Sequence, residues 1–364
     1  MKVFITFNHP APYKVALFNG LASFFDLHVI FERTKARNRN KIFYQDQQYK
    51  FNFHTIRGWC LGDENFLSWG IKKHLKQNSY DLIVMNGYST IAEMIALRYL
   101  KKHHIPYIFA INGGVVRTKE NRFKRGIKHY FIDGATFYLS PSEEADRYLL
   151  HYGVERKRIL HYPYSTIYEH EIATKKITSL EKRFLRKQLG IDGEQVFISV
   201  GQFIERKNNM RLLKIWKLMP KSRTLVLIGD GPDRVKYENF IKDNKIENVC
   251  LLNFKARKDV LNLLRISDYA IFLSKEDIYG HVVNEALSQG LGVIASNKMV
   301  AARTLVQDGS NGFLVDPENE AQVLFSINTI VTKDFYHKAI EVAKQNTIEA
   351  MVARHVEIFS GADK

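Results

Sequence analysis

Short apolar segments alternate with segments of helical spacing from one end of this 364-residue chain to the other. Residues 3–7 and 27–31, for example, are apolar and flank residues 13–25, where apolar side chains recur at helical intervals. A chain that alternates strand and helix in this way builds a parallel sheet wound with helices. Further strands are predicted at 81–85, 105–111, 134–139, 158–162, 195–201, 223–229, 249–252, 269–273, 292–296 and 312–315.

The alternation lapses between about residues 166 and 189, where a lysine-rich amphipathic segment stands instead. Strong periodicity on both sides of such a break is typical of a domain connection, and the chain is too long for one typical core. We therefore predict an α/β protein with two Rossmann-like, doubly wound parallel-sheet domains facing across a cleft. The predicted bounds are 1–172 and 173–344, with a C-terminal helix over 345–364 packing back towards the N-terminal domain.

The charge of the chain indicates an anionic partner. It carries 54 Lys and Arg against 38 Asp and Glu, a net charge of +16, and residues 1–172 contribute +10 of it, from 25 basic and 15 acidic side chains. The excess is densest at residues 33–41 and 117–128. Such runs attract anionic lipid or phosphate groups, although each run alone also fits a solvated surface.

Cysteine content and hydropathy favour a cytoplasmic globular protein. Cys60 and Cys250 lie far apart and have neither metal-ligand spacing nor a disulfide framework around them. No apolar stretch approaches the roughly 18–20 residues of a membrane-spanning helix, and the first residues do not resemble a signal peptide. We therefore expect a cytoplasmic protein without a structural metal.

An acidic segment follows the apolar strand at 269–273. Asp277 precedes a helix that starts after Gly280, and Glu285 lies eight positions beyond Asp277. In an open α/β sheet, ligands bind where strands run into helices, because free backbone N–H groups converge there. The two carboxylates can therefore hold hydroxyl groups of a ligand. A helix cap with a solvated glutamate is the simpler alternative.

Three other motifs accompany this segment in a fixed order. Gly201-Gln202-Phe203-Ile204-Glu205-Arg206-Lys207 follows the strand at 195–201, and Gly229-Asp230-Gly231-Pro232 follows the strand at 223–229. Asp308-Gly309-Ser310-Asn311-Gly312 comes last. In order and spacing, residues 195–320 resemble the nucleotide-binding domain of retaining glycosyltransferases of family 4, also called glycosyl transferases group 1, which have the GT-B fold. The first half resembles the family more loosely, at 10–15 and 111–114.

The resemblance implies roles for individual residues. Asp277 would bond hydroxyls of the donor sugar and Lys207 would stabilise the departing diphosphate, with Asn112 standing where the family often has histidine or aspartate. Asp277 replaces the family's first glutamate, so the adjacent Glu276 stays open as the functional acid. Glu285 would hold the ribose diol. Further donor-binding positions implied are Gly201, Gln202, Arg206, Gly280, His281 and Val282, together with the loop residues Gly113 and Gly114. Gln202 stands in place of the family's arginine.

The resemblance also implies a reaction and its partners. It implies a metal-independent, retaining transfer from a nucleotide diphosphate sugar, with a UDP-sugar favoured and a GDP-sugar open, and no other cofactor. The C-terminal domain would bind the donor. The N-terminal domain would bind a saccharide or polyprenyl-pyrophosphate-linked acceptor, for synthesis of a cell-surface polysaccharide such as a capsule or exopolysaccharide. The basic N-terminal half then predicts peripheral association with the anionic inner face of the membrane.

Two other classes of protein are alternatives to a glycosyltransferase. A dinucleotide-dependent oxidoreductase should carry Gly-x-Gly-x-x-Gly after its first strand, where this chain has His9-Pro10-Ala11-Pro12. A non-catalytic GT-B-like binding or accessory subunit agrees with the replacements at Gln202, Asp277 and Asn112 and remains the alternative. We expect no nucleic-acid partner, because no recognition motif accompanies the basic charge.

Overall fold

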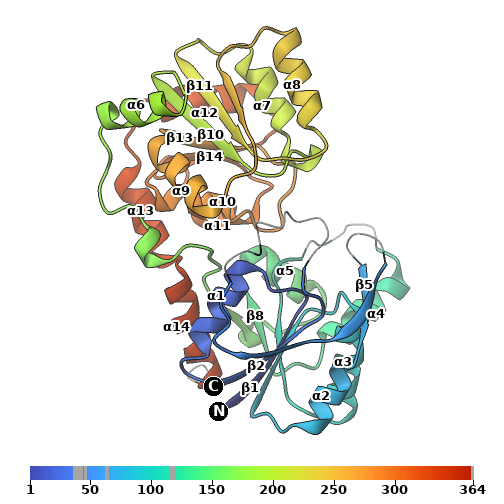
Figure 1. The fold of residues 1–364 in the computed structure, drawn as a ribbon. Helices are drawn as coiled ribbons and strands as arrows, with labels where there is room; N and C mark the ends of the chain where they lie inside the picture. The colour runs from blue at the N-terminus through green and yellow to red at the C-terminus, as the bar shows by residue number, and fades with distance from the viewer. Residues whose placement is uncertain (36–43, 45–46, 62–64, 115, 117–119, 362–364) are drawn as a thin grey trace. The chain divides into compact units, whose positions relative to one another are not determined.

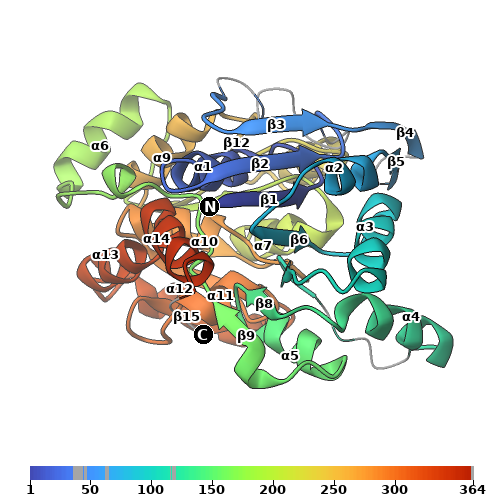
Figure 2. The same ribbon diagram turned by 90° about the horizontal axis from the view of Figure 1, so that it is seen from below.

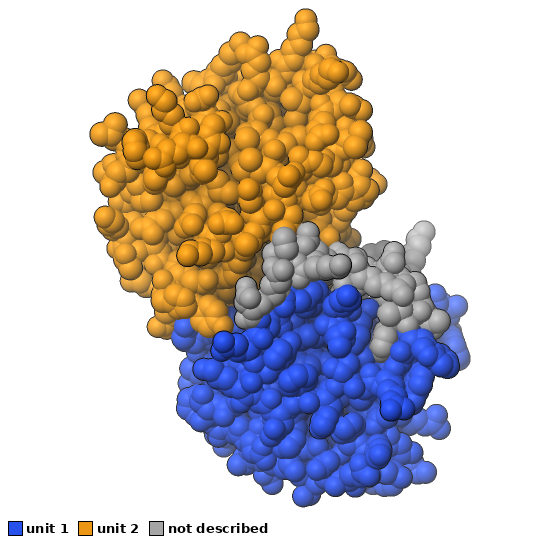
Figure 3. Space-filling view, viewed as in Figure 1, with its two compact units in different colours: residues 1–164, 348–364 blue, residues 165–347 orange. Residues whose placement is uncertain are grey.

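The computed structural model describes residues 1–35, 44, 47–61, 65–114, 116 and 120–361 of the chain. Its residues form two compact units, coloured separately in Figure 3. Unit 1 comprises residues 1–164 and 348–364, and unit 2 comprises residues 165–347. The chain therefore passes from one unit to the other twice.

Unit 1 is built on a parallel sheet of seven strands in the order β3-β2-β1-β6-β7-β8-β9 (Figures 1 and 2). Its central strands are buried and apolar, and helices cover both faces (Figure 2), as expected for a parallel sheet. The strands are β1 (Lys2–Phe7), β2 (Asp26–Phe31), β3 (Asn52–Thr55), β6 (Leu82–Asn86), β7 (Ile108–Ala110), β8 (Phe137–Ser140) and β9 (Ile159–His161). The helices are α1 (Pro12–Leu21), α2 (Ile71–Gln77), α3 (Ile91–Lys102), α4 (Arg122–Ile132), α5 (Glu143–His151) and α14 (Ile348–Phe359), with a 3-10 turn η2 (Arg156–Arg158).

A two-stranded antiparallel hairpin of β4 (Arg57–Leu61) and β5 (Asn65–Trp69) adds to unit 1. The sequence did not predict this hairpin, β3 or α2. The reason is local: β3 has four exposed residues, so it lacks the apolar run that marks the buried strands. The last helix, α14, packs on the first, α1, so the two ends of the chain meet within unit 1.

Unit 2 contains a parallel sheet of six strands in the order β12-β11-β10-β13-β14-β15. The strands are β10 (Gln195–Val200), β11 (Arg223–Ile228), β12 (Val249–Leu252), β13 (Tyr269–Phe272), β14 (Gly292–Ser296) and β15 (Gly312–Val315). The helices are α6 (Ser179–Gln188), α7 (Asn209–Trp216), α8 (Arg234–Asp243), α9 (Arg257–Ile266), α10 (Val282–Ser288), α11 (Val300–Leu305), α12 (Glu320–Ile330) and α13 (Tyr336–Gln345), with 3-10 turns η3 (Glu169–Glu171) and η4 (Glu205–Lys207).

The order of strands creates one switch point in each sheet. In unit 2, the chain leaves β10 towards β11 and β12 on one side and later returns to β13 on the other side. The loops after β10 and β13 therefore start side by side at the carboxyl edge of the sheet. Such a position is where ligands bind in open α/β folds. In unit 1, the corresponding switch point lies between β1 and β6.

Candidate active site

Lys207 and Asp277 meet at the switch point of unit 2. Lys207 ends the 3-10 turn η4 after β10, and Asp277 lies in the loop after β13. The Lys207 ammonium donates a hydrogen bond to Oδ2 of Asp277, and both side chains are largely buried. The structure thus brings together two predicted site residues that are 70 positions apart in the chain.

Two glycines allow the loop after β11 to pack tightly against the loop after β10. A Cβ at Gly229 would collide with the carbonyl oxygen of Gly201, and a Cβ at Gly231 would lie 2.5 Å from the carbonyl oxygen of Phe203. The backbone of Phe203 also donates to the carbonyl of Asp230 over 2.8 Å. The Gly-x-Gly turn after β11 therefore packs closely on the loop that carries Gly201 and Gln202. This contact holds the backbone that leads to Lys207 in place.

Cations hold Asp277 in its ionised form. Arg206 Nη1 lies 3.4 Å from Oδ1 of Asp277 and also donates to the Glu276 carbonyl over 2.9 Å. Burial alone would raise the pKa of Asp277, but the charges of Lys207 and Arg206 outweigh it and hold this pKa below its usual value. Glu276 contributes its backbone to this contact, while its side chain is exposed. The geometry agrees with Asp277 as the carboxylate at the switch point.

Gly280 gives the chain a sharp turn between Asp277 and helix α10. Its φ of +93° is unfavourable for other residues, and an added Cβ would lie 2.7 Å from the Cε atom of Met299. His281 and Val282 follow at once, where α10 begins. Val282 also lines a small cavity with Gly201, Lys207, Ser274 and Met299. The turn thus directs the start of α10 towards the Lys207–Asp277 pair.

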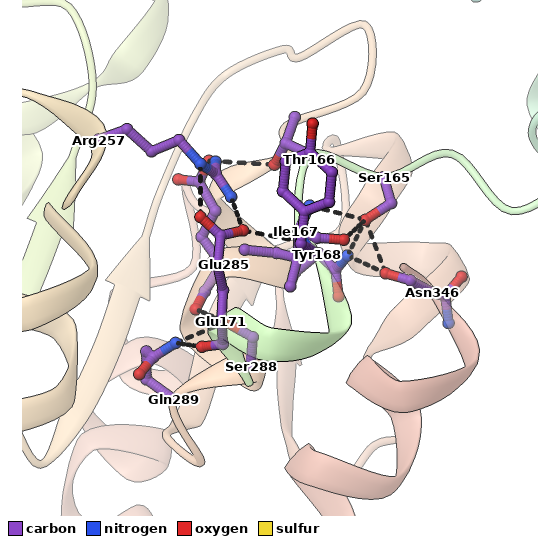
Figure 4. Close-up of polar contacts among 11 residues, drawn as sticks. Ser165, Thr166, Ile167, Tyr168, Glu171, Arg257, Glu285, Ser288, Gln289 and Asn346 are labelled. Carbon is purple, nitrogen blue, oxygen red and sulfur yellow. Dashed lines mark hydrogen bonds and ion pairs between the residues drawn. The ribbon is translucent and has the colours of Figure 1, made fainter. Parts of the chain in front are cut away.

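Glu285 lies in α10 and is held by residues that the sequence did not single out (Figure 4). Its Oε1 atom accepts from Nη1 of Arg257 over 3.2 Å and from the hydroxyl of Thr166 over 3.1 Å. The Arg257 guanidinium also bonds Glu171 through Nη2 (2.6 Å) and Nε (3.2 Å). Burial would lower the pKa of Arg257, but the two carboxylates raise it. One oxygen of Glu285 is thus fixed by two donors.

Hydrogen bonds from side-chain amides anchor the segment that supplies Thr166 and Glu171. The buried Asn284, next to Glu285, donates to Ser165 Oγ over 3.0 Å and to the Asn346 carbonyl over 2.7 Å. Gln289 donates to the Glu171 carbonyl over 2.8 Å. These bonds tie residues 165–171 to α10 and to the end of α13. No pattern in the sequence connects Glu285 with Thr166, Glu171, Arg257 and Asn346, because these residues come from four separate stretches of the chain.

The predicted residues of the first half lie in unit 1. Asn112, Gly113 and Gly114 follow β7 at the carboxyl edge of its sheet, and the Asn112 Oδ1 atom is buried without a hydrogen-bond partner in the described part of the chain. A Cβ at Gly114 would lie 2.5 Å from the ring of Tyr148, whose hydroxyl bonds that of Tyr88. Gly114 is therefore explained by close packing against a tyrosine ring.

Within the described residues, no group of three or more His, Cys, Asp or Glu side chains is arranged to hold a metal ion. Positive charge at the switch point of unit 2 comes instead from Lys207 and Arg206. The arrangement can therefore bind an anionic group between the loops after β10 and β13, with a carboxylate beside it.

Comparisons with known proteins point to one family. Residues 181–347 match the family model described as glycosyl transferases group 1. An uncharacterized glycosyltransferase of Haemophilus influenzae is 25% identical over 306 residues, covering 80% of this chain and 79% of that protein. The N-acetylgalactosamine-N,N'-diacetylbacillosaminyl-diphospho-undecaprenol 4-alpha-N-acetylgalactosaminyltransferase of Campylobacter jejuni is 25% identical over 147 residues, 40% of each chain. The chain spans 40% of the length of the first curated relatives that it matches.

The fold has close counterparts among solved structures. HepE from Anabaena in complex with UDP has a TM-score of 0.80 over 99% of this chain and 100% of that chain, at 18% identity. At this identity the likeness concerns the fold alone, and it confirms the predicted α/β class with the parallel sheets of the GT-B fold.

Proposed function

We propose that the chain transfers a sugar from a nucleotide diphosphate sugar to a saccharide or lipid-linked acceptor. The proposal starts from residues 181–347, which belong to the glycosyl transferases group 1 family. The observation that carries the proposal is the Lys207–Asp277 pair at the switch point of unit 2. A donor needs a cation for its diphosphate and a carboxylate for its sugar hydroxyls, and these two groups lie side by side there. HepE is solved with UDP and with UDP-glucose, which supports a UDP-sugar as the donor, and a GDP-sugar is the second choice.

In the proposed reaction, the bond between the anomeric carbon of the sugar and the diphosphate oxygen breaks. The acceptor hydroxyl oxygen bonds the anomeric carbon on the same face, so configuration is retained, and the departing diphosphate takes the acceptor proton. Lys207, with Arg206 beside it, stabilises the charge that develops on the diphosphate, as preorganised cations do in such sites. With these cations in place, the proposed transfer is metal-independent.

Glu285 anchors the ribose of the donor in this proposal. Arg257 and Thr166 hold its Oε1 atom, so the second carboxylate oxygen is directed to accept hydrogen bonds from the ribose hydroxyls. Asp277 accepts hydrogen bonds from hydroxyl groups of the donor sugar. Asn112, Gly113 and Gly114 of unit 1 are proposed to line the donor or acceptor path, and Asn112 contributes hydrogen bonds rather than a base.

We further propose that the acceptor is anchored in a membrane. The Campylobacter jejuni relative is named for a diphospho-undecaprenol acceptor, which supports a polyprenyl-pyrophosphate acceptor and a role in surface-polysaccharide synthesis. No helix in the described ranges is long and apolar enough to cross a bilayer. Helix α4 exposes Arg122, Lys124, Arg125 and the aromatic Phe123, and we propose that it docks on the anionic inner face of the membrane. Residues 36–41 and 117–119 of the two predicted basic runs lie outside the described residues.

Calorimetric titration with UDP tests the nucleotide site through Glu285→Ala. Charge-assisted hydrogen bonds contribute about 1.5–3 kcal/mol each, so the variant should weaken UDP binding by more than about tenfold. Glu276→Ala removes an exposed carboxylate nearby and should leave the affinity unchanged. An unchanged affinity in Glu285→Ala would remove this residue from the site.

A non-catalytic binding subunit remains the second candidate, because Gln202 carries no charge where the family has arginine. Wild-type protein that binds UDP-sugars tightly, yet neither transfers nor hydrolyses them with saccharide or polyprenyl-pyrophosphate acceptors, would favour that candidate.

A further inference from the structure

Helix α6 is attached to unit 2 by its charged side. Arg186 is buried, donates from Nε to the Ile266 carbonyl over 2.7 Å, and pairs with Asp268 over 2.6 Å. Lys182, one turn earlier, pairs with the same carboxylate over 3.1 Å. Both residues face α9 and the loop before β13. Ion pairs and a hydrogen bond from its charged side therefore attach α6 to unit 2.

The apolar side chains of α6 point to solvent. Leu180 is 78% exposed and Phe184 is 65% exposed, and they are one helical turn apart on the same face. Leu185 and Leu189 are exposed as well. Helices of globular proteins ordinarily bury their apolar face and expose their charges. This helix has the reverse orientation, and Figures 1 and 2 show it at the periphery of unit 2.

Basic residues surround this apolar face. Arg183 and Lys187 are exposed on the same side of α6, within one turn of Leu180 and Phe184. A groove of about 620 Å³ lies along Leu180, Phe184 and Leu185 and is also lined by Lys175, Arg265 and one carboxylate, Glu181.

A second cavity continues this groove. It measures about 390 Å³ and is also lined by Lys175 and Arg265, together with Lys333. Two carboxylates, Asp268 and Asp334, line it as well, and both are in ion pairs with lysine or arginine. In the described part of the chain, these three cations form no ion pair, whereas Lys176 is paired with Asp334 over 2.7 Å. An apolar surface therefore continues directly into a basic cavity, and an anionic amphiphile has this combination of chemistry.

From this arrangement we propose that α6 and the adjoining basic cavity form a docking surface for an anionic lipid bilayer, distinct from α4 of unit 1. Leu180 and Phe184 enter the boundary between headgroups and acyl chains. Arg183 and Lys187 extend their stems along the apolar layer and keep their charges among the headgroups. The cavity with Lys175, Arg265 and Lys333 receives a lipid phosphate. The charges select a bilayer over an apolar protein partner, and the ten-residue helix makes the binding reversible.

Co-sedimentation of the full chain with vesicles tests this surface. Vesicles of phosphatidylglycerol and phosphatidylcholine should bind the wild type, and Leu180→Ser with Phe184→Ser should weaken binding by about tenfold or more, because two apolar side chains leave the bilayer. Phe325→Ser is the matched control, since Phe325 is 66% exposed on α12 of the same unit. It should bind vesicles as the wild type does. Inorganic phosphate as competitor separates capture of a free anion from binding to a membrane.

Depth of insertion gives a second readout. Phe184→Trp should be quenched by brominated phosphatidylglycerol, whereas Phe325→Trp should gain no quenching over the wild type. Equal binding of the wild type and the double serine variant, or no quenching at position 184, would overturn the proposal. A concentration-dependent dimer that the serine variant abolishes, without vesicle binding, would also overturn it and assign the face to a second copy of the chain. UDP affinity should not change in these variants, so this test is independent of the proposed glycosyl transfer.

Discussion

Lys207 should act mainly in the transition state of the transfer. In the free protein it is paired with Asp277, and a bound donor offers its ammonium a diphosphate whose charge grows as the bond breaks. Lys207→Met keeps the apolar stem that lies against Gly201 but removes the charge. We expect turnover to fall by about a hundredfold or more, as when an electrostatic contact to a developing charge is lost, with a smaller rise in donor KM. Steady-state kinetics measures both values.

Arg206→Gln is the control for this residue, since Arg206 is more exposed and 3.4 Å from Asp277. Its turnover should fall less than that of Lys207→Met. Wild-type turnover in Lys207→Met would show that the lysine serves structure only, and a large loss in Arg206→Gln would transfer the role to the arginine.

Local patterns in the sequence indicate Lys207, Asp277 and Gly280, but no local pattern indicates Arg257 or Glu171. Lys207, Asp277 and Gly280 each follow a buried strand, so strand periodicity and turn residues reveal where they stand. Arg257 begins an ordinary amphipathic helix, and Glu171 lies in a connecting segment without periodicity. Their pairing with Glu285 depends on tertiary contacts between distant segments, which no spacing rule reports.

At the scale of elements, α4 should supply electrostatic attraction to membranes. Each basic residue near an anionic surface contributes about 1 kcal/mol. Replacing Arg122, Lys124 and Arg125 with Gln should therefore weaken binding to phosphatidylglycerol vesicles by about a hundredfold at low salt. In the wild type this contribution should disappear at about 1 M salt, where the Debye length is roughly 3 Å. Vesicle co-sedimentation over a salt series measures the effect.

A charge-matched control comes from unit 2. Lys214, Lys236 and Lys242 are exposed, and their replacement with Gln removes the same total charge elsewhere on the chain. The control variant should retain most of the binding. Equal losses in the two triple variants would indicate that total charge matters and that α4 is no specific docking element.

At the scale of the whole molecule, the two parallel sheets were predictable because their strands are buried on both faces and appear as continuous apolar runs. The antiparallel hairpin and the exposed β3 were not, since polar and apolar residues mix at 52–69 without a clear period. Likewise, the orientation of α6 does not follow from its amphipathic pattern. The periodicity predicts that its apolar side is buried. In the structure, Arg186 faces Asp268 inside unit 2, and the apolar side faces solvent.

The two crossings between the units make the chain's last helix part of unit 1. Val352 of α14 occupies the space beside Gly20 of α1, and a Cβ at Gly20 would collide with its Cγ2 atom. Met351 is fully buried, and the ring centroids of Phe25 and Phe359 lie 5.9 Å apart in the same contact region. Gly20 is thus a point of tight contact between the first and the last helix of the chain.

Gly20→Ala should therefore destabilise the protein although it adds a better helix former. Alanine in place of glycine gains about 1 kcal/mol of helix propensity, whereas overpacking costs about 1–3 kcal/mol, and the rigid β-branched Val352 cannot rotate away freely. We expect a lower Tm for Gly20→Ala and for Val352→Ala, but Gly20→Ala with Val352→Ala should be more stable than the sum of the two losses implies. Calorimetry of the four proteins measures this coupling. Strictly additive losses would mean that α14 adjusts its position on α1, and a higher Tm in Gly20→Ala alone would mean that the two helices are not in tight contact.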